Sequence, residues 1–520
     1  MKSGDRLPAA LPIDRGQLRF ALLLACAFLA LAGIGAIRHE LWRDEMQAWL
    51  VARDEPDLRG VIEQSHYEGS PPLWTLMLRP LTLATHRPEA MQALTWIIAG
   101  ATVFLIAGFA PFGRLQRALL VGNYYLLFEY GIVCRNYLPG IFLLVAAMAL
   151  MPSSRERPWL FAAALAGAAL ASVHSLIVAV AVAAAFAVRC RAAPAGGGKR
   201  GASAPGMPPV LPLLAVAAGV GLAIAAVLPR PDTLYPQASG WNLDWNVDRL
   251  AKVSCAFVRS YFPSPSPPGF FWIPPWDRPP PSFDHGWALA LAVALFGGSI
   301  LLLRRHAAAL ILYLVGTLGI AAFLYLRYLG FYRHAGFLFL AFLFALWLKK
   351  SGGPGRDPGF RGWLDRTGEI VFTVALVVQA ATGLWALQQD FTRPFSCGKQ
   401  AARYLTDHRL GNAFIAVGPD WAGSPLAGYL DRSVYYPAAS RFGSFTRWDT
   451  RRTEDLDDEE FLRRAAREAQ GAEIIVALDR AWPQAFLRSH QIESLAELHG
   501  SLTPFEDYFL YRVPGRAAGR

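Results

Sequence analysis

Long runs of apolar residues alternate with short polar segments over the first three quarters of the chain. A helix that crosses a membrane needs about 20 consecutive apolar residues, and several of these runs reach or approach that length. The run from Trp159 to Val188 also fits one long tilted helix, but we favour two short helices that separate near His174. The pattern predicts eleven spans, at 18–37, 90–110, 117–133, 137–151, 159–173, 175–188, 209–228, 285–303, 307–326, 334–348 and 368–388.

Basic residues mark the segments on one side of these spans. If the N-terminus lies in the cytoplasm, every cytoplasmic segment carries Lys or Arg, as the positive-inside rule requires. A single span over Trp159–Val188 would break this alternation, so the charges favour an odd number of crossings. We expect a multi-pass protein of the cell (inner) membrane with an extracytoplasmic C-terminus. The basic residues are Lys2, Arg6, Arg15, Arg19, Arg114, Arg117, Arg155, Arg157, Arg189, Arg191, Lys199, Arg200, Arg304, Arg305, Lys349, Lys350, Arg356, Arg361 and Arg366.

The first extracytoplasmic loop, 38–89, opens with the stretch HELWRDEMQAWL, His39 to Leu50. A helix over 41–52 has one apolar face, formed by Trp42, Met46, Trp49 and Leu50. Asp44 lies roughly opposite this face, so we expect the aromatic side chains in lipid and Asp44 turned toward the protein. An alternative is that Asp44 and Glu45 only solvate a helix end. Ionisable groups that face inward at a membrane are more often functional.

A second motif in the same loop is HYEGSPPLWTLMLRP, His66 to Pro80. Ser70 is a good N-cap, and Pro71 fits the first position of a helix. A plain helix start accounts for these two residues but not for His66 and Glu68, which precede them. His66 and Glu68 are therefore candidate substrate-binding residues.

Two further polar groups lie at the extracytoplasmic ends of spans. The motif VCRNYLPG places Arg135, Asn136 and Tyr137 between the third and fourth spans. His174 and Ser175 lie at the break between the fifth and sixth spans. A lone histidine in an apolar run is more often a structural residue with satisfied hydrogen bonds, and we interpret His174 in that way.

Positive charge also lies at the extracytoplasmic ends of the ninth and tenth spans, at Arg327, Arg333 and His334. Cations on this side go against the positive-inside rule, so they indicate an anionic partner. A lipid phosphate fits, because guanidinium groups bind phosphate in a bidentate manner. The alternative is a generic contact with lipid headgroups, made by side chains that snorkel.

Composition separates the remaining segments. The chain is 54% hydrophobic and only 17% charged, whereas a soluble chain carries about a quarter charged residues. The net charge of +11 therefore reflects basic cytoplasmic loops and not nucleic-acid binding. The extracytoplasmic loop 229–284 is dense in Pro, Trp and Phe and is expected at the level of the headgroups. The segment 192–208 reads as a flexible cytoplasmic linker.

The tail, residues 389–520, is expected to form a small extracytoplasmic α/β domain that follows a membrane domain of residues 1–388. The stretches NAFIAVGP, RSVYYP, AEIIVALD and EDYFLYRV predict strands, and SPLAGYL and EDLDDEEFLRRAAREA predict helices. No Walker loop, GxGxxG or HExxH motif occurs in the sequence, and its five cysteines form no CxxC pair.

Acids, arginines and histidines from five distant places in the chain are thus predicted to meet at one face of the membrane. A transporter is expected to carry ionisable groups near the midplane and paired broken helices in matching halves. The spans here are largely free of charge. A carboxylate beside phosphate-binding cations suits group transfer from a lipid phosphate to an acceptor.

At these residues the sequence resembles the GT-C superfamily of glycosyltransferases, in the branch of the protein O-mannosyltransferases and the lipid A aminoarabinose transferases. WRDEMQAW resembles their acidic first-loop motif, EGSPPLWTLML their "PPL" helix start, and CRNYLPG their "SRxY" turn. The resemblance covers residues 18 to about 390 and is weak over the tail. The sequence departs from the pattern at Cys134, where Ser is common, and in DEMQ, but neither departure touches the acid.

The resemblance implies a GT-C-like fold of polytopic helices and an inverting transfer of sugar from a polyprenyl-phosphate carrier to an acceptor hydroxyl. By similarity, Asp44 is the general base that accepts the proton of the attacking hydroxyl. The leaving phosphate needs positive charge, which Arg135 and Arg333, with His334 or Arg327, would supply.

Other residues receive supporting roles. Glu45 is expected to orient Asp44 or to bind sugar hydroxyls, and His66, Glu68, Asn136 and Tyr137 to bind substrate. No cofactor is implied. A divalent metal on His66, Glu68 and Asp44 is conceivable, but no ligand spacing calls for one. The loop 229–284 would cover the substrate groove.

Two rival functions stay open. A transporter or flippase for lipid-linked glycans would need an ion gradient and give no covalent product. A non-catalytic membrane scaffold would depend on the tail and not on Asp44. In the favoured reading the acceptor is a lipid, a glycan or a protein, membrane lipids surround the protein, and no nucleic acid takes part.

Overall fold

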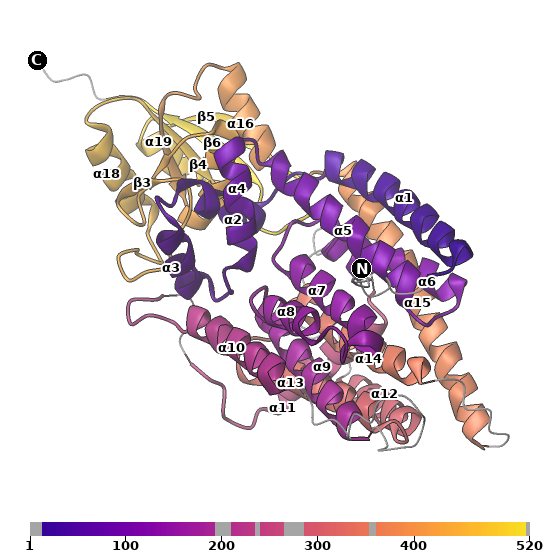
Figure 1. The fold of residues 1–520 in the computed structure, drawn as a ribbon. Helices are drawn as coiled ribbons and strands as arrows, with labels where there is room; N and C mark the ends of the chain where they lie inside the picture. The colour runs from indigo at the N-terminus through magenta and orange to yellow at the C-terminus, as the bar shows by residue number, and fades with distance from the viewer. Residues whose placement is uncertain (1–12, 193–209, 235–239, 265–284, 353–359, 516–520) are drawn as a thin grey trace, which may run out of the picture.

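The computed structural model describes residues 13–192, 210–234, 240–264, 285–352 and 360–515. These residues form a bundle of helices with a smaller α/β unit at one end (Figure 1). Seven of the described helices are long and apolar enough to cross a membrane, and three are shorter but apolar. The protein is therefore a membrane protein by the length and composition of its helices. The seven are α1 (Arg15–Arg38), α5 (Glu89–Phe109), α9 (Val173–Ala192), α10 (Val210–Val227), α13 (Ala307–Leu326), α14 (Tyr332–Ser351) and α15 (Phe360–Thr392).

The three shorter apolar helices are α7 (Tyr137–Leu150), α8 (Pro158–Ala169) and α12 (His285–Leu303). Ten of the eleven predicted spans coincide with one of these long or short helices. α8 and α9 are separate helices joined by residues 170–172, so the predicted break near His174 is confirmed. The number of crossings and the side on which each terminus lies stay predictions.

The predicted span 117–133 is not one helix, which corrects that expectation. It consists of α6 (Arg114–Val121), the π-helical turn η1 (Tyr124–Glu129) and an irregular stretch. The segment still follows α15: Gln116 bonds to Glu369, and Ile132 and Leu387 pack on the same glycine, Gly35. From Glu369 to Leu387 an α-helix rises about 27 Å, close to the thickness of a hydrocarbon core. The segment thus runs along the bundle in a broken form.

α14 is the central helix of the bundle. Of its apolar window 78% is buried, against 22% for α10 at the periphery. α14 packs against α13, which also packs against α9. The three helices approach closely at Gly316, where an added methyl would meet Ala341 and Ala181. Small residues at such crossings are typical of membrane helices, because dispersion contacts replace the hydrophobic effect as the packing force.

Three short helices form the first loop: α2 (Arg43–Asp54), α3 (Leu58–Glu68) and α4 (Leu73–Ala84). The helix predicted over 41–52 is confirmed as α2, but its apolar face does not lie in lipid. That face packs against α4 and against α17 (Gly423–Leu430) of the C-terminal unit, and its buried residues include Trp42, Met46, Trp49 and Leu50. The C-terminal unit helps to cover this face, and the sequence of the loop alone does not predict this contact.

The N-cap assignment of Ser70 is also wrong. α4 begins at Leu73, two residues later than expected, with Pro72 at the N-cap position and no side-chain cap. Thr75 instead donates its hydroxyl to the Pro72 carbonyl.

The C-terminal unit contains a six-stranded mixed sheet, which confirms the predicted small domain with strands and helices. Its strand order is β3-β2-β1-β4-β6-β5, with β2, β1 and β4 parallel and the outer pairs antiparallel. Four strands match the prediction, whereas β3 and β5 were not predicted. The strands are β1 (Phe414–Gly418), β2 (Val434–Tyr436), β3 (Arg441–Gly443), β4 (Ile474–Leu478), β5 (Glu493–Leu498) and β6 (Tyr508–Val513).

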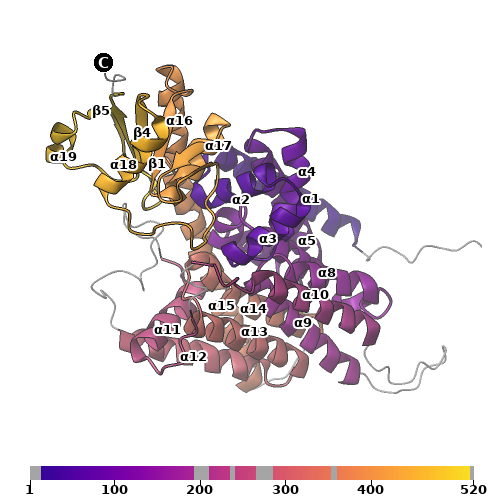
Figure 2. The same ribbon diagram turned by 90° about the vertical axis from the view of Figure 1, so that its left-hand side faces the viewer.

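Helices flank this sheet on both faces. α17 and α18 (Asp458–Ala469) match the predicted helices, and α16 (Gly398–Asp407) and α19 (Gln484–Ser489) are additional. Alternate residues of β1 enter different cores: Ile415 and Val417 belong to the cluster that continues into the helix bundle, and Ala416 belongs to the cluster around α18. The sheet is therefore built onto the bundle and not tethered beside it (Figure 2).

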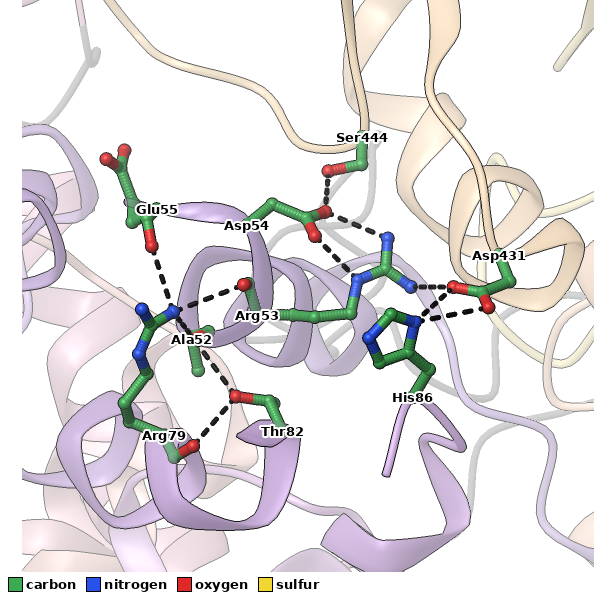
Figure 3. Close-up of polar contacts among 9 residues, drawn as sticks. All are labelled: Ala52, Arg53, Asp54, Glu55, Arg79, Thr82, His86, Asp431 and Ser444. Carbon is green, nitrogen blue, oxygen red and sulfur yellow. Dashed lines mark hydrogen bonds and ion pairs between the residues drawn. The ribbon is translucent and has the colours of Figure 1, made fainter. Parts of the chain in front are cut away.

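Polar contacts complete the attachment at the end of α2 (Figure 3). Arg79 of α4 donates to the carbonyls of Ala52, Arg53 and Glu55, which are left open where α2 ends. Arg53 in turn forms an ion pair with Asp431 of the C-terminal unit, at 2.7 Å. The first loop is thus fixed to the C-terminal unit by the packing of α2 on α17 and by the Arg53–Asp431 ion pair.

The loop 229–284 contains a helix that was not predicted, α11 (Val247–Tyr261), which packs against α12 and α14. Most of its Pro-rich stretch, residues 265–284, lies outside the described residues, as does the expected linker from residue 193 on.

At the end of the bundle remote from the C-terminal unit, Lys349 and Lys350 pair with Asp365 and Glu369 at 2.6 Å each.

Candidate functional site

A cavity of about 710 Å³ lies between the first loop, the ends of several bundle helices and the C-terminal unit. Its walls come from α2, α3 and the start of α4, from residues 135–137 and 172–174, from 323–334, and from three loops of the C-terminal unit. The volume is in the range of small-molecule sites. Nine of the ten predicted site residues line it: Asp44, His66, Glu68, Arg135, Asn136, Tyr137, Arg327, Arg333 and His334.

Asp44 stands at the centre of the cationic part of this cavity. Its Oδ2 lies 2.5 Å from Arg135 Nη1 and 3.7 Å from Arg333 Nη2. The side chain of Asp44 is 32% exposed, whereas that of Arg333 is 5% exposed. The prediction that the first-loop acid and the guanidinium groups share one pocket is therefore confirmed.

The neighbouring cations control the ionisation of Asp44. Burial on its own acts to raise the pKa of this carboxyl, but the guanidinium groups of Arg135, Arg333 and Arg43 outweigh burial and hold the pKa below its usual value. Asp44 is therefore ionised at neutral pH. An anion that binds the arginines will relieve this effect and raise the proton affinity of Asp44.

Glu45, the tenth predicted residue, does not line the cavity. Its side chain is fully buried, so the expectation that it binds sugar hydroxyls is wrong. Its Oε2 lies 3.0 Å from His39 Nε2 and accepts the Trp42 N–H at 3.1 Å, and its Oε1 accepts the Cys134 N–H at 2.5 Å. Glu45 thus ties the start of α2, which carries Asp44, to the stretch that carries Arg135.

His39 extends this buried cluster to α15. Its Nδ1 lies 2.9 Å from Asp390 Oδ2. Burial on its own lowers the pKa of His39, but the carboxylates of Asp390 and Glu45 outweigh it and raise the pKa to about 10. His39 is therefore a buried cation between two carboxylates, and it joins the end of α1 to the start of α2 and to the last turns of α15.

His334 is engaged on both ring nitrogens. Its Nδ1 accepts the Phe331 N–H at 2.8 Å, so the neutral ring carries its proton on Nε2, 2.7 Å from the Tyr137 hydroxyl. This arrangement removes His334 as a source of positive charge. The ring of His174 lies 4.9 Å from that of His334, and His174 lines the cavity. Its Nε2 has no hydrogen-bond partner among the described residues, so His174 is not the satisfied structural residue that we expected.

Arg327 and Asn136 are held by backbone groups. Arg327 donates to the Gly240 carbonyl and lies 5.6 Å from the centroid of Trp241. Asn136 donates to the Ala171 carbonyl at 3.2 Å. Each shapes the wall of the cavity on the side of α13 or of the α8–α9 break.

His66 and Glu68 line the cavity from α3. His66 Nδ1 is 2.7 Å from the Leu228 carbonyl oxygen, and Glu68 accepts a hydrogen bond from Gln47 at 2.7 Å. Burial raises the pKa of Glu68 to about 7, against the hydrogen bonds from Gln47 and Gln64. In the part of the chain that is described, no three His, Cys, Asp or Glu side chains are grouped as a metal site.

The tail supplies one wall of the cavity, and none of its lining residues was predicted from the sequence. Trp421, Thr446, Trp448, Thr503 and Phe505 all line the cavity. They come from three separate loops of the C-terminal unit, so no local motif connects them. One aromatic residue in each of three otherwise polar turns is the signal that the sequence offers.

Comparison with known proteins adds no relative to this picture. No protein-family model matches the chain, and no curated protein matches it.

Proposed function

We propose that this protein is an inverting glycosyltransferase of the GT-C type, which moves a sugar from a polyprenyl-phosphate carrier to an acceptor hydroxyl on the extracytoplasmic face of the membrane. The observation that carries the proposal is the contact of Asp44 with two arginines inside one cavity, at 2.5 and 3.7 Å. A base and a phosphate-binding pair are the two chemical elements that such a transfer needs.

The proposed reaction displaces phosphate from the anomeric carbon. The acceptor oxygen forms a bond to this carbon as the bond to the phosphate oxygen breaks, and the phosphate keeps the electron pair. The hydroxyl proton passes to Asp44. Because the nucleophile attacks opposite the leaving group, the configuration inverts. A phosphate monoester is a stable leaving group, so no acid is needed.

Binding of the donor would raise the proton affinity of Asp44. Arg135 and Arg333 both direct their charge at Asp44. A phosphate placed between these arginines takes up part of that charge, which raises the proton affinity of Asp44 when the hydroxyl must lose its proton. The apolar residues Val227 and Phe323 line the cavity beside the bundle helices, where a prenyl chain would lie.

The test compares Asp44→Asn with Asp54→Asn in a membrane assay that detects glycosylated envelope products by mass spectrometry. The two aspartates lie on the same helix, each is 32% exposed and each pairs with an arginine, but Asp54 does not line the cavity. Loss of a general base lowers the rate by about 10²–10⁴-fold. Asp44→Asn should show this loss and Asp54→Asn should not; full activity of Asp44→Asn rejects the general base.

A further inference from the structure

The C-terminal unit contributes an aromatic wall to the cavity, opposite the bundle. Its rings are Trp421, within the 3₁₀ turn Asp420–Ala422, Trp448, in the loop after β3, and Phe505, in the loop before β6. Trp421 and Phe505 meet edge to face at 6.0 Å. Phe505 is 63% exposed and has a backbone φ of +62°. A large apolar side chain held out in this conformation, which is unfavourable for residues other than glycine, is a feature of binding sites.

The two tryptophans are held in place by arginines. Arg43 lies 4.4 Å from the centroid of Trp421, and Arg452 lies 4.5 Å from that of Trp448. Arg452 is itself fixed by Asp420, with hydrogen bonds of 2.8 and 3.0 Å. Rigid aromatic faces bind a ligand without a large loss of side-chain entropy.

Polar groups that suit hydroxyl ligands surround these rings. The cavity residues Gln64, Thr446 and Thr503 each have a buried oxygen with no hydrogen-bond partner within the described part of the chain: Oε1, Oγ1 and Oγ1. A buried oxygen without a hydrogen-bond partner is unfavourable, so a ligand hydroxyl that bonds to it is stabilised. Glu68 adds a carboxyl group on the same side.

One side chain, that of Arg43, connects this wall to the proposed base. The Arg43 guanidinium that stacks on Trp421 has its Nε 3.9 Å from Asp44 Oδ1. Trp421 and the proposed base therefore contact the same arginine.

We propose that this wall, formed by Trp421, Trp448 and Phe505 with Gln64, Thr446 and Thr503, is the acceptor subsite and that it binds a saccharide. The faces of a pyranose ring carry C–H groups that stack on aromatic rings, and its hydroxyls both donate to and accept from amide and hydroxyl groups. A saccharide is favoured over a peptide because the oxygens of Gln64, Thr446 and Thr503 line the same cavity as the aromatic rings, and peptide binding is the competing outcome of the test. That the bound saccharide is the acceptor rests on the proposed function, but the binding of saccharide does not depend on transfer.

The experiment measures binding of the full chain, held in lipid nanodiscs, to two arrays. One array carries neutral and acidic oligosaccharides, and the other carries Ser- and Thr-containing peptides. Wild type should bind oligosaccharides, and Trp421→Ala and Phe505→Ala should bind them about tenfold or more weakly, as for truncated aromatic anchors. Phe442→Ala is the matched control, because Phe442 is a half-exposed aromatic of the same unit that does not line the cavity.

A transfer assay on the same wild-type preparation separates this proposal from the previous one. Oligosaccharide binding by a wild type that shows no transfer would reject the enzyme and keep the subsite. The subsite is rejected if wild type binds no oligosaccharide, if it binds only peptides, or if Phe505→Ala binds as Phe442→Ala does. Phe505 is mostly exposed, so its truncation should leave folding intact, which a thermal melt checks.

Discussion

Replacement of Glu45 by alanine should destabilise the protein far more than the loss of an ordinary acidic residue. The carboxylate is fully buried and has three partners: the His39 ring, the Trp42 N–H and the Cys134 N–H. Glu45→Ala leaves the two N–H groups without an acceptor and leaves His39 with Asp390 as its one remaining carboxylate partner in this cluster.

The magnitude follows from burial. Removing one member of a buried ion pair costs about 3–5 kcal/mol, because the remaining charge is left uncompensated in a medium of low dielectric constant. The matched control is Glu63→Ala on α3. Glu63 pairs with Arg59 at 2.9 Å, but the Arg59 side chain is 84% exposed, and such pairs contribute about 0–1 kcal/mol.

The assay is denaturant unfolding in detergent micelles, followed by tryptophan fluorescence, for Glu45→Ala, His39→Ala and the double variant. Because His39 and Glu45 are in contact, the double-mutant cycle should give a coupling free energy of about 1–3 kcal/mol. Proton linkage gives a second signature. His39 has a pKa near 6.5 when unfolded and about 10 when folded, so the native state binds more protons in between. Stability should therefore fall as pH rises through this window, and less so in His39→Ala.

Three results would contradict this reasoning. The first is that Glu45→Ala and Glu63→Ala unfold at the same denaturant concentration. The second is that the stability lost by the double variant equals the sum of the losses of the two single variants. The third is that the stability of wild type and of His39→Ala changes equally with pH. Any of these would mean that the His39 cluster does not hold α2 against α15.

Two further predictions concern the cavity. Arg333→Ala should raise the KM for the prenyl-phosphate donor by about tenfold or more, because a charge-assisted hydrogen bond contributes about 1.5–3 kcal/mol; an unchanged KM places the phosphate elsewhere. Glu68→Gln should reduce the pH dependence of stability. Burial raises the pKa of Glu68 from 4.5 to about 7, so the native state holds an extra proton between these values, and the wild type should lose stability as pH rises from about 5 to about 8. Equal slopes for wild type and Glu68→Gln would contradict this.

The apolar runs and the charge pattern were enough to locate most of the helices. Membrane helices satisfy their backbone hydrogen bonds within the segment, so composition over a window of residues predicts them without reference to partners. The same reasoning failed at 117–133, where the apolar run is interrupted by a π-helical turn that Asn123 begins by accepting the Leu126 N–H. Local side-chain bonds of this kind are invisible to an average over a window.

The charged residues of the site were also found from the sequence, because ionisable groups beside membrane spans are costly and therefore rare. What each one does was decided by tertiary contacts. Asp44 and Glu45 are adjacent and chemically alike, yet Asp44 enters the cavity and Glu45 is fully buried against His39. One residue along a helix turns a side chain by about 100°, and only the packed neighbours say which direction is the cavity.

The sequence by itself thus determined a bundle of apolar helices, a small α/β unit and a set of acids and arginines at helix ends. The tertiary structure alone decided that the tail closes the cavity with Trp421, Trp448 and Phe505, that α2 is covered by protein, and that His334 is neutral. The physical reason is that hydropathy and helix length are properties of a segment, whereas burial, ion pairing and protonation depend on groups brought together from distant parts of the chain.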